Sequence, residues 1–419
     1  MNKQSKIQNP KSKILIVGAG PAGASAAIRL AQTGFPVTLI EREKFPRPKL
    51  CGEFISPECL EHFRALGVYE SLTAGGGEWI KETIFYEPGG KSVAVPSRWL
   101  HHGAAGALSL SRAEMDFRLM QRARAVGVEV LEETQAVGLL TENDASVSAA
   151  TVVGVKIRQK NGETREIAAA LTIDATGRAR VLAKLAERQL RITNYELRIE
   201  ENKRNTKLVG FKTHLKNAAV APGVCEIYSF QGGYGGLCRV ENGLANHCFL
   251  IQSEIVKKFG GDAERIVRET VRQNRRAAET LKNAESESDW LAVAVDGFGA
   301  RDLTPARNLF AVGDAGAFID PFTGSGMLVA LESGAILARG IAENFAAPEK
   351  IAAVYRARHA RNFGRRLFVC SLVRRAAFAS GLAKTLISAL NWSETARAVL
   401  ARATRRGAST TAEKRENFL

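Results

Sequence analysis

Three glycines near the N-terminus have the spacing of a phosphate-binding turn. Gly18, Gly20 and Gly23 form a Gly-X-Gly-X-X-Gly pattern, with Pro21 and Ala22 between the last two glycines. The first glycine permits a tight turn, the second lets backbone approach a pyrophosphate, and the third lets a helix lie close to a strand. The N–H groups at a helix N-terminus also attract phosphate. The pattern therefore predicts a dinucleotide site that includes all five residues.

The residues around this motif predict the elements that must position it. Residues 13–18 form a short apolar run that ends in glycine, which is typical of a buried parallel strand. Residues 22–32 are rich in alanine and are followed by Gly34, so we expect a helix that stops there. Residues 37–41 predict a second strand. The order strand, glycine turn, helix, strand is that of a Rossmann βαβ unit.

Glu41 ends the second predicted strand, eighteen residues after Gly23. A carboxylate at this place accepts hydrogen bonds from the hydroxyls of an adenosine ribose. Arg42 follows, and either stacks on the adenine or only caps the strand. The basic residues of the next segment hold phosphates or a nicotinamide, or belong to a solvated loop: Lys44, Arg47 and Lys49. An acid at this place suits FAD and NAD equally, so other segments must decide the cofactor.

A second glycine-rich segment lies almost three hundred residues downstream, at residues 309–327. An apolar strand leads into Gly313 and Asp314, a pair that FAD proteins use to hold the ribityl and ribose region. The helix expected from residue 327 can stabilise negative charge on a reduced flavin through its N-terminus. Its turn and start complete this part of the predicted site: Gly324, Ser325, Gly326 and Met327. A NAD dehydrogenase has no need for this second element, so the sequence predicts FAD.

Further residues of the predicted cofactor site lie between the two glycine motifs. Residues 174–178 read Asp-Ala-Thr-Gly-Arg after another predicted strand, which adds Asp174 and Gly177. Arg112 lies at the start of a helix expected over residues 111–126. Val137 completes the predicted set of cofactor-binding residues.

This combination of motifs resembles the glutathione-reductase-type FAD fold of the p-hydroxybenzoate hydroxylase superfamily, and most closely the geranylgeranyl reductase family. The resemblance covers roughly residues 13–345 and rests on these segments: residues 18–23, 41–42 and 48–53, Arg112 with Asp116, and residues 174–177 and 313–327. In that family the pair matching Cys51 and Gly52 lies beside the isoalloxazine ring, and the arginine matching Arg112 contacts the cofactor. The resemblance implies FAD, NADPH or NADH as a transiently docked hydride donor, and an apolar or aromatic substrate.

The expected fold is an α/β FAD-binding domain of the Rossmann type with an inserted α+β substrate domain built on an antiparallel sheet. We predict the FAD-binding domain in three segments, residues 11–80, 106–185 and 296–345. The substrate domain then takes two segments, residues 81–105 and 186–295. A C-terminal helical region is expected over residues 346–406, followed by a disordered tail over residues 407–419.

The six cysteines are scattered without metal-like spacing, so we expect no metal site and a cytoplasmic protein with reduced thiols. Cys51 is the one candidate catalytic residue, against the alternative of a small thiol that only contacts flavin. The predicted substrate contacts are Tyr228, Tyr234 and Gly235, because prenyl reductases place an aromatic motif over the substrate cavity in this segment. The tryptophan and the Phe-Pro pair of that motif are replaced here, which weakens the prediction of a prenyl substrate.

The formal charge of +16 is concentrated near the C-terminus, where residues 351–407 contain twelve Lys or Arg and a single acid, Glu394. Such a patch suits nucleic acid, an anionic membrane surface or a phosphorylated substrate, or it is a solvated helix face. No nucleic-acid-binding motif accompanies it, so we expect no nucleic acid partner. Residues 367–390 either lie on a membrane surface or form a helical lid. No apolar stretch is long enough to predict a membrane span.

Together these features predict an FAD-dependent oxidoreductase. The leading prediction is NAD(P)H-linked reduction, or dehydrogenation, of a carbon–carbon bond in a hydrophobic isoprenoid-like or aromatic substrate. The alternative is a monooxygenase that hydroxylates or epoxidises an apolar small molecule. A halogenase ranks lower because a Trp-X-Trp-X-Ile-Pro segment is missing and residues 46–53 differ from the halogenase pattern. A membrane-associated electron-transfer flavoprotein also ranks lower.

Overall fold

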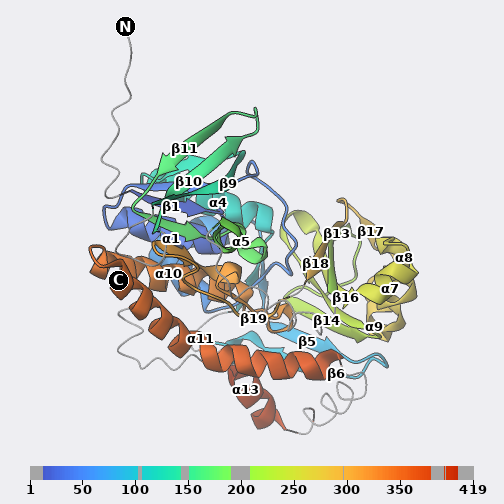
Figure 1. The fold of residues 1–419 in the computed structure, drawn as a ribbon. Helices are drawn as coiled ribbons and strands as arrows, with labels where there is room; N and C mark the ends of the chain where they lie inside the picture. Colours follow the sequence, from blue (N-terminus) through green and yellow to red (C-terminus); the bar gives the residue numbers. More distant parts are fainter. Residues whose placement is uncertain are drawn as a thin grey trace.

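The computed structural model (Figure 1) describes residues 13–101, 106–142, 151–189, 208–295, 297–378, 391 and 393–403. The predicted tail at residues 407–419, and residues 379–390 of the basic stretch, lie outside these ranges. None of the helices within them combines the length and apolar character that crossing a bilayer requires.

A five-stranded parallel sheet forms the centre of the predicted FAD-binding domain, called the FAD-binding part below. Its strand order is β20 (Leu309–Ala311), β12 (Leu171–Asp174), β1 (Ile14–Val17), β2 (Val37–Ile40) and β8 (Glu129–Leu131). Every neighbouring pair is parallel. The first four strands are buried along their whole length, which explains their continuous apolar sequence.

The two faces of this sheet are covered by different elements. Ile14 and Ile16 face the helices α1 (Pro21–Gln32), α4 (Arg112–Ala125) and α10 (Gly326–Asn344). Leu15 and Val17 face the opposite side, toward α5 (Val181–Gln189) and a three-stranded antiparallel sheet. The strands of that sheet are β9 (Thr134–Glu142), β10 (Thr151–Gln159) and β11 (Thr164–Ala168).

A second, eight-stranded sheet lies in the predicted substrate domain and is called the substrate sheet below. Its order is β17-β13-β16-β15-β14-β5-β6, with β18 paired to β13. The strands are β5 (Glu82–Tyr86), β6 (Ser92–Pro96), β13 (Leu208–Lys216), β14 (Val224–Phe230), β15 (Gly233–Arg239), β16 (Ala245–Gln252), β17 (Glu285–Ser286) and β18 (Leu291–Val295). All pairings are antiparallel except β14 with β5. The predicted fold class, a Rossmann-type domain with an inserted antiparallel sheet, is therefore confirmed, while the exact domain boundaries stay a prediction.

Smaller elements complete the molecule. A three-stranded sheet lies between the two parts and consists of β3 (Phe54–Ile55), β4 (Glu78–Ile80) and β7 (Ala107–Ser109). The short helices are α2 (Cys59–Leu66), α3 (Tyr69–Thr73), α7 (Ser253–Lys258), α8 (Ala263–Glu269) and α9 (Arg275–Thr280), and β19 (Gly299–Ala300) pairs with β21 (Ala317–Phe318).

Two stretches change element along the chain. Residues 166–173 belong to two strands, because the chain leaves β11 and enters β12 in a different sheet. Apolar character along the sequence does not show such a change of partner. Helices α8 and α9 are separate, and Asn274, which accepts a hydrogen bond from the backbone N–H of Ala277, caps α9.

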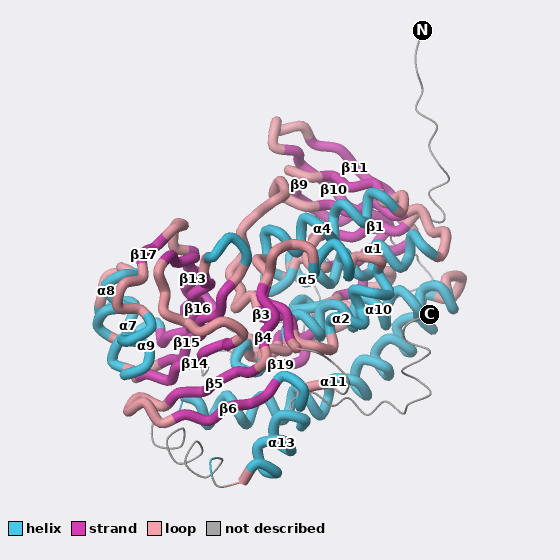
Figure 2. The backbone as a smooth tube through the Cα atoms, turned by 180° about the vertical axis from the view of Figure 1, so that it is seen from behind, coloured by secondary structure: helices cyan, strands magenta, loops and turns pink. Residues whose placement is uncertain are grey.

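The C-terminal region is helical as predicted, with α11 (Pro348–Phe378) and α13 (Glu394–Ala403) described. Helix α11 packs on α10, and α13 packs on β6 and on the 3₁₀ turn η2 (Ser97–Trp99). Figure 2 shows α13 beside β6, so this helix lies against the eight-stranded sheet.

The approach of α10 to α1 depends on a single glycine. A Cβ at Gly334 would lie 2.5 Å from the carbonyl oxygen of Ala22 and 3.1 Å from the backbone nitrogen of Ala26. The Ser25 hydroxyl donates a 2.8 Å hydrogen bond to the Leu331 carbonyl across the same interface. Only glycine therefore allows this backbone contact, which holds the start of α1 against α10.

We expect Gly334→Ala to destabilise the protein by roughly 1–3 kcal/mol, because the added methyl overpacks the α1–α10 interface. Gly340→Ala on the same helix is the matched control, since the nearest atom to its Cβ is 4.0 Å away. Alanine favours a helix interior over glycine by about 0.5–1 kcal/mol, so this control should keep or raise the melting temperature. Equal melting temperatures for the two variants would contradict the assignment.

Candidate functional site

One large cavity lies where the parallel sheet meets the substrate sheet. Its volume is about 1130 Å³, whereas small-molecule pockets commonly occupy about 300–1,000 Å³. The cavity therefore has room for a large cofactor and a second ligand. Most of the predicted site residues line it: Gly18, Gly20, Pro21, Ala22, Glu41, Arg42, Cys51, Gly52, Arg112, Gly177, Tyr234, Gly235, Gly313, Asp314, Gly324, Gly326 and Met327.

Three predicted cofactor residues support the cavity from behind rather than line it. A Cβ at Gly23 would lie 1.9 Å from the Gly18 carbonyl oxygen, so this glycine serves the close packing of α1. The buried carboxylate of Asp174 accepts hydrogen bonds from the backbone nitrogens of Thr176, at 3.0 Å, and Ala183, at 2.9 Å. Ser325 is completely buried beneath the start of α10. These residues shape the turns on which the cavity-lining residues stand.

Two further predicted residues are not brought to the cavity. Tyr228 is fully buried on the opposite face of β14, where its hydroxyl donates to Glu226, while Ile227 and Ser229 line the cavity. Successive strand residues point to alternate faces of the sheet, so the predicted residue Tyr228 points away from the cavity. Val137 likewise does not line the cavity, although its neighbours on β9, Gln135 and Ala136, do.

The N-terminus of α1 is shaped to receive a phosphate. Gly20 is the N-cap, no side chain caps the helix, its first turn contains no acid, and Pro21 occupies the first turn without an N–H of its own. The atom nearest to a Cβ at Gly20 would be Arg112 Nη2, at 3.8 Å, so open space lies beside this backbone. The uncapped N–H groups, the open groove and the nearby guanidinium together fit a pyrophosphate.

Glu41 is fixed by its neighbours at the end of β2. Its Oε2 atom accepts hydrogen bonds from the Ala19 backbone nitrogen, at 3.0 Å, and from Arg47 Nη2, at 3.2 Å. Arg47 also lies 3.2 Å from Asp116, which in turn forms a two-point ion pair with Arg112 at 3.0 and 2.8 Å. Arg47 thus serves a buried ion-pair chain, and the alternative of a solvated loop residue is wrong for it.

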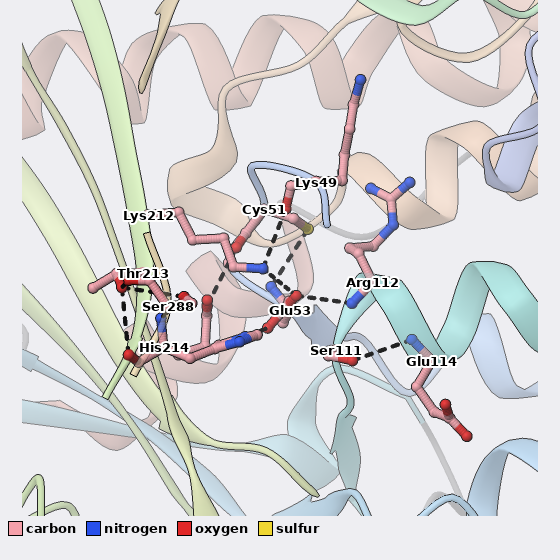
Figure 3. A network of polar contacts seen from close by, with 12 residues as sticks. Lys49, Cys51, Glu53, Ser111, Arg112, Glu114, Lys212, Thr213, His214 and Ser288 are labelled. Carbon is pink, nitrogen blue, oxygen red and sulfur yellow. Dashed lines mark hydrogen bonds and ion pairs between the residues drawn. The ribbon is translucent and has the colours of Figure 1, made fainter. Parts of the chain in front are cut away.

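Lys49 is a basic residue of this region whose ammonium forms no ion pair with any described residue. Figure 3 shows its side chain extending on the same side as that of Arg112, away from Glu53. The Lys49 side chain reaches open space in the cavity, but partial desolvation by the surrounding walls, together with the positive charges of Arg47 and Arg112, lowers the pKa of Lys49 to about 8. An anion placed here would relieve this repulsion, so the position suits a phosphate group.

A buried polar network holds the segment that contains Cys51 and Gly52. The completely buried carboxylate of Glu53 accepts hydrogen bonds from the Arg112 backbone nitrogen, at 2.8 Å, from His214 Nε2, at 2.7 Å, and from the Lys212 ammonium (Figure 3). Burial alone would raise the pKa of Glu53, but the His214 hydrogen bond and the Lys212 charge hold it below its ordinary value.

Sequence reasoning missed Lys212 and His214. Both lie on β13 with one residue between them, so their side chains leave the same face of the strand. Glu53 belongs to a quoted motif, but its partners stand in no motif and come from a segment about 160 residues away. A charged lysine within an otherwise buried strand is the one signal that could have indicated them.

The comparison with known protein families agrees with this geometry. The model of an FAD binding domain family matches residues 11–368. The chain belongs to this family. Membership of this family supports FAD as the cofactor, and the groove beside Gly20, the helix start at Gly326 and the turn at Gly313 form the candidate FAD site.

Relatives whose names indicate two different reactions align with most of this chain. A tryptophan 2-halogenase of Chondromyces crocatus is 28% identical over 345 residues, which are 80% of this chain and 62% of the halogenase. A digeranylgeranylglycerophospholipid reductase of Methanosarcina mazei is 26% identical over 333 residues, 77% of this chain and 73% of the reductase. Among solved structures, a flavin-dependent brominase has the same fold, with a TM-score of 0.75, 18% identity and 94% of each chain covered. The predicted resemblance to geranylgeranyl reductases is confirmed, and halogenases stand beside them.

We expect Gly20→Val to weaken FAD binding by roughly 100-fold or more, equivalent to about 2.7 kcal/mol, because the side chain fills the groove without striking the protein. FAD content after purification and a dissociation constant from flavin fluorescence measure this. Gly364→Val on α11 is the control, since no atom lies within 4 Å of its Cβ. Normal FAD content in Gly20→Val would place the pyrophosphate elsewhere.

A second prediction concerns the FAD-free protein and pH. The folded protein disfavours protonated Lys49, so this cost is fully present below pH 8 and fades as pH rises toward the ordinary lysine value of 10.5. Lys49→Gln should therefore raise the melting temperature of the FAD-free protein at pH 7, by an amount that shrinks above pH 8, while it weakens FAD binding. Lys44→Gln, at a nearby position that does not line the cavity, should change neither. A lower melting temperature for Lys49→Gln at pH 7 would contradict this.

Proposed function

We propose that this protein is an FAD-dependent reductase that adds hydrogen to a carbon–carbon double bond of a hydrophobic small molecule, with NADPH or NADH as the reductant. Bound FAD supplies a ring system that takes up and gives up hydride. The observation that carries the proposal is the apolar wall of the cavity, which continues from the FAD motifs into the substrate sheet.

That wall is built from residues far apart in sequence that the sheet brings together. They include Phe85 and Val93 from the first strand pair, and Ile227 and Leu250 from the later strands. Phe85 lies beside Phe322, with ring centroids 5.5 Å apart, so the apolar surface reaches the turn that precedes α10. Such a surface excludes water and suits an isoprenoid or aromatic body rather than a polar one.

Cys51 is the candidate group for the proton that double-bond reduction needs besides hydride. Its Sγ atom accepts the Glu53 backbone N–H at 3.4 Å and lies at the junction of the FAD motifs and the apolar wall. In the proposed step, hydride reaches one carbon, the S–H proton reaches the other, and solvent returns a proton to the sulfur. The alternative is a thiol that only contacts FAD.

A halogenase, or a monooxygenase that hydroxylates or epoxidises, is the second candidate. The 28% identity to a tryptophan 2-halogenase over most of this chain favours it. The reductase is preferred because the reductase relative matches over 73% of its own length, against 62% for the halogenase. Peripheral membrane contact through the basic C-terminal helices would suit a lipid-like substrate and stays a prediction.

We expect the FAD-loaded protein to convert a polyisoprenoid alcohol under strictly anaerobic conditions, with NADPH or NADH, to a product that has gained two hydrogen atoms by mass spectrometry. Gly20→Val is the flavin-free control. Product that forms only with O₂ would identify a monooxygenase, and a further requirement for chloride or bromide would identify a halogenase. Failure to oxidise either nicotinamide would instead favour an electron-transfer flavoprotein.

A further inference from the structure

Helix α13 lines one side of the cavity, next to β6. It contributes Arg397, Leu400 and Ala401 to the cavity lining. Residues three and four positions apart lie on the same face of a helix, so this face of α13 is directed at the cavity. Because α13 packs on β6, its apolar residues extend the wall that Val93 and Val95 begin.

Arg397 stands out on this wall because of its charge. The other charged residues that line the cavity within the described ranges come from the FAD-binding segments: Glu41, Arg42, Glu43, Arg47, Lys49, Glu53, Arg112, Arg178 and Asp314. The β5, β6 and α13 wall adds one charge among its described residues, the Arg397 guanidinium. The cavity thus has an ionic cofactor end and an apolar end with one cation.

Within the described part of the chain, the Nε atom of Arg397 is buried and forms no hydrogen bond. The guanidinium lies over the face of Trp99, whose ring centroid is 5.8 Å from Arg397 Cζ. This contact orients a planar guanidinium while leaving its N–H donors free for a ligand. A buried donor without an acceptor is costly, and a bound oxyanion would remove that cost.

We propose that Arg397 binds an oxyanion, a carboxylate or a phosphate monoester, at one end of an otherwise apolar substrate. Arginine recognises both groups through paired N–H donors. The apolar chain then follows the wall from α13 toward the FAD motifs, which places the far end of the molecule at Cys51. The inference rests on the proposed function only for that last placement, because the anion site itself is defined by Arg397, Trp99 and α13.

The test measures binding without turnover, so it stays informative if the proposed reaction is wrong. The FAD-loaded protein is titrated with dodecyl phosphate, dodecanoate and dodecanol below their micelle concentrations, and with inorganic phosphate. Calorimetry gives the affinity, and the flavin absorption spectrum reports whether the ligand reaches the cofactor end. We expect both anionic amphiphiles to bind roughly 10- to 100-fold more tightly than dodecanol, and inorganic phosphate to bind far more weakly than dodecyl phosphate.

Arg397→Gln should abolish this preference and leave dodecanol binding unchanged, while Arg397→Lys should keep part of it. Arg402→Gln is the matched control, because Arg402 lies exposed on the same helix and does not line the cavity. Normal FAD content and melting temperature confirm that each variant is folded. Equal binding of dodecyl phosphate and dodecanol to the wild type, or an unchanged preference in Arg397→Gln, would overturn the proposal. Inorganic phosphate binding as tightly as dodecyl phosphate would also overturn it.

Discussion

The Glu53 carboxylate joins the two parts of the molecule at the wall of the candidate site. Removing a carboxylate from water costs several kcal/mol by order of magnitude, and only paired donors offset this. Here the donors come from both parts, the Arg112 backbone from α4 and the Lys212 and His214 side chains from β13. Glu53 also holds a positive φ of 55°, a strained conformation for this residue type. The free-energy costs of burying this carboxylate and of its backbone conformation are offset only when the substrate sheet is packed on the FAD-binding part.

This arrangement explains how the Cys51–Gly52 segment keeps its place without regular structure of its own. The segment is anchored at Glu53, and the Asn246 side chain donates a 3.2 Å hydrogen bond to the Cys51 carbonyl. Tyr234 adds a second link across the same boundary through its 2.6 Å hydrogen bond to Asp320, next to the turn before α10. The FAD site and the apolar wall are therefore held in register by polar contacts that neither part could satisfy alone.

The parts of the fold and of the candidate site that depend on local backbone requirements could be predicted from the sequence. The turn at Gly18, the start of α1 and the second glycine segment need particular residue types at fixed spacing, so they can be read directly. Contacts between distant segments carry no such pattern. Lys212, His214 and Arg397 contact residues from distant segments that the fold brings close to them, and no spacing in the sequence indicates these contacts. The error at Tyr228 has a related cause, because a one-residue shift along β14 reverses the face of every side chain.

The same topology also explains why the fold leaves the reaction open. Both a halogenase and a reductase align with most of this chain, so the FAD-binding family to which it belongs is compatible with both kinds of enzyme. The reaction is decided on the other side of the cofactor, by which side chains the substrate sheet and α13 present. In this protein most of those side chains are apolar, and Arg397 is the charged one among the described residues that form the β5, β6 and α13 wall. Such a wall can exclude water and orient a substrate, so it is where single side chains can separate one reaction of this fold from another.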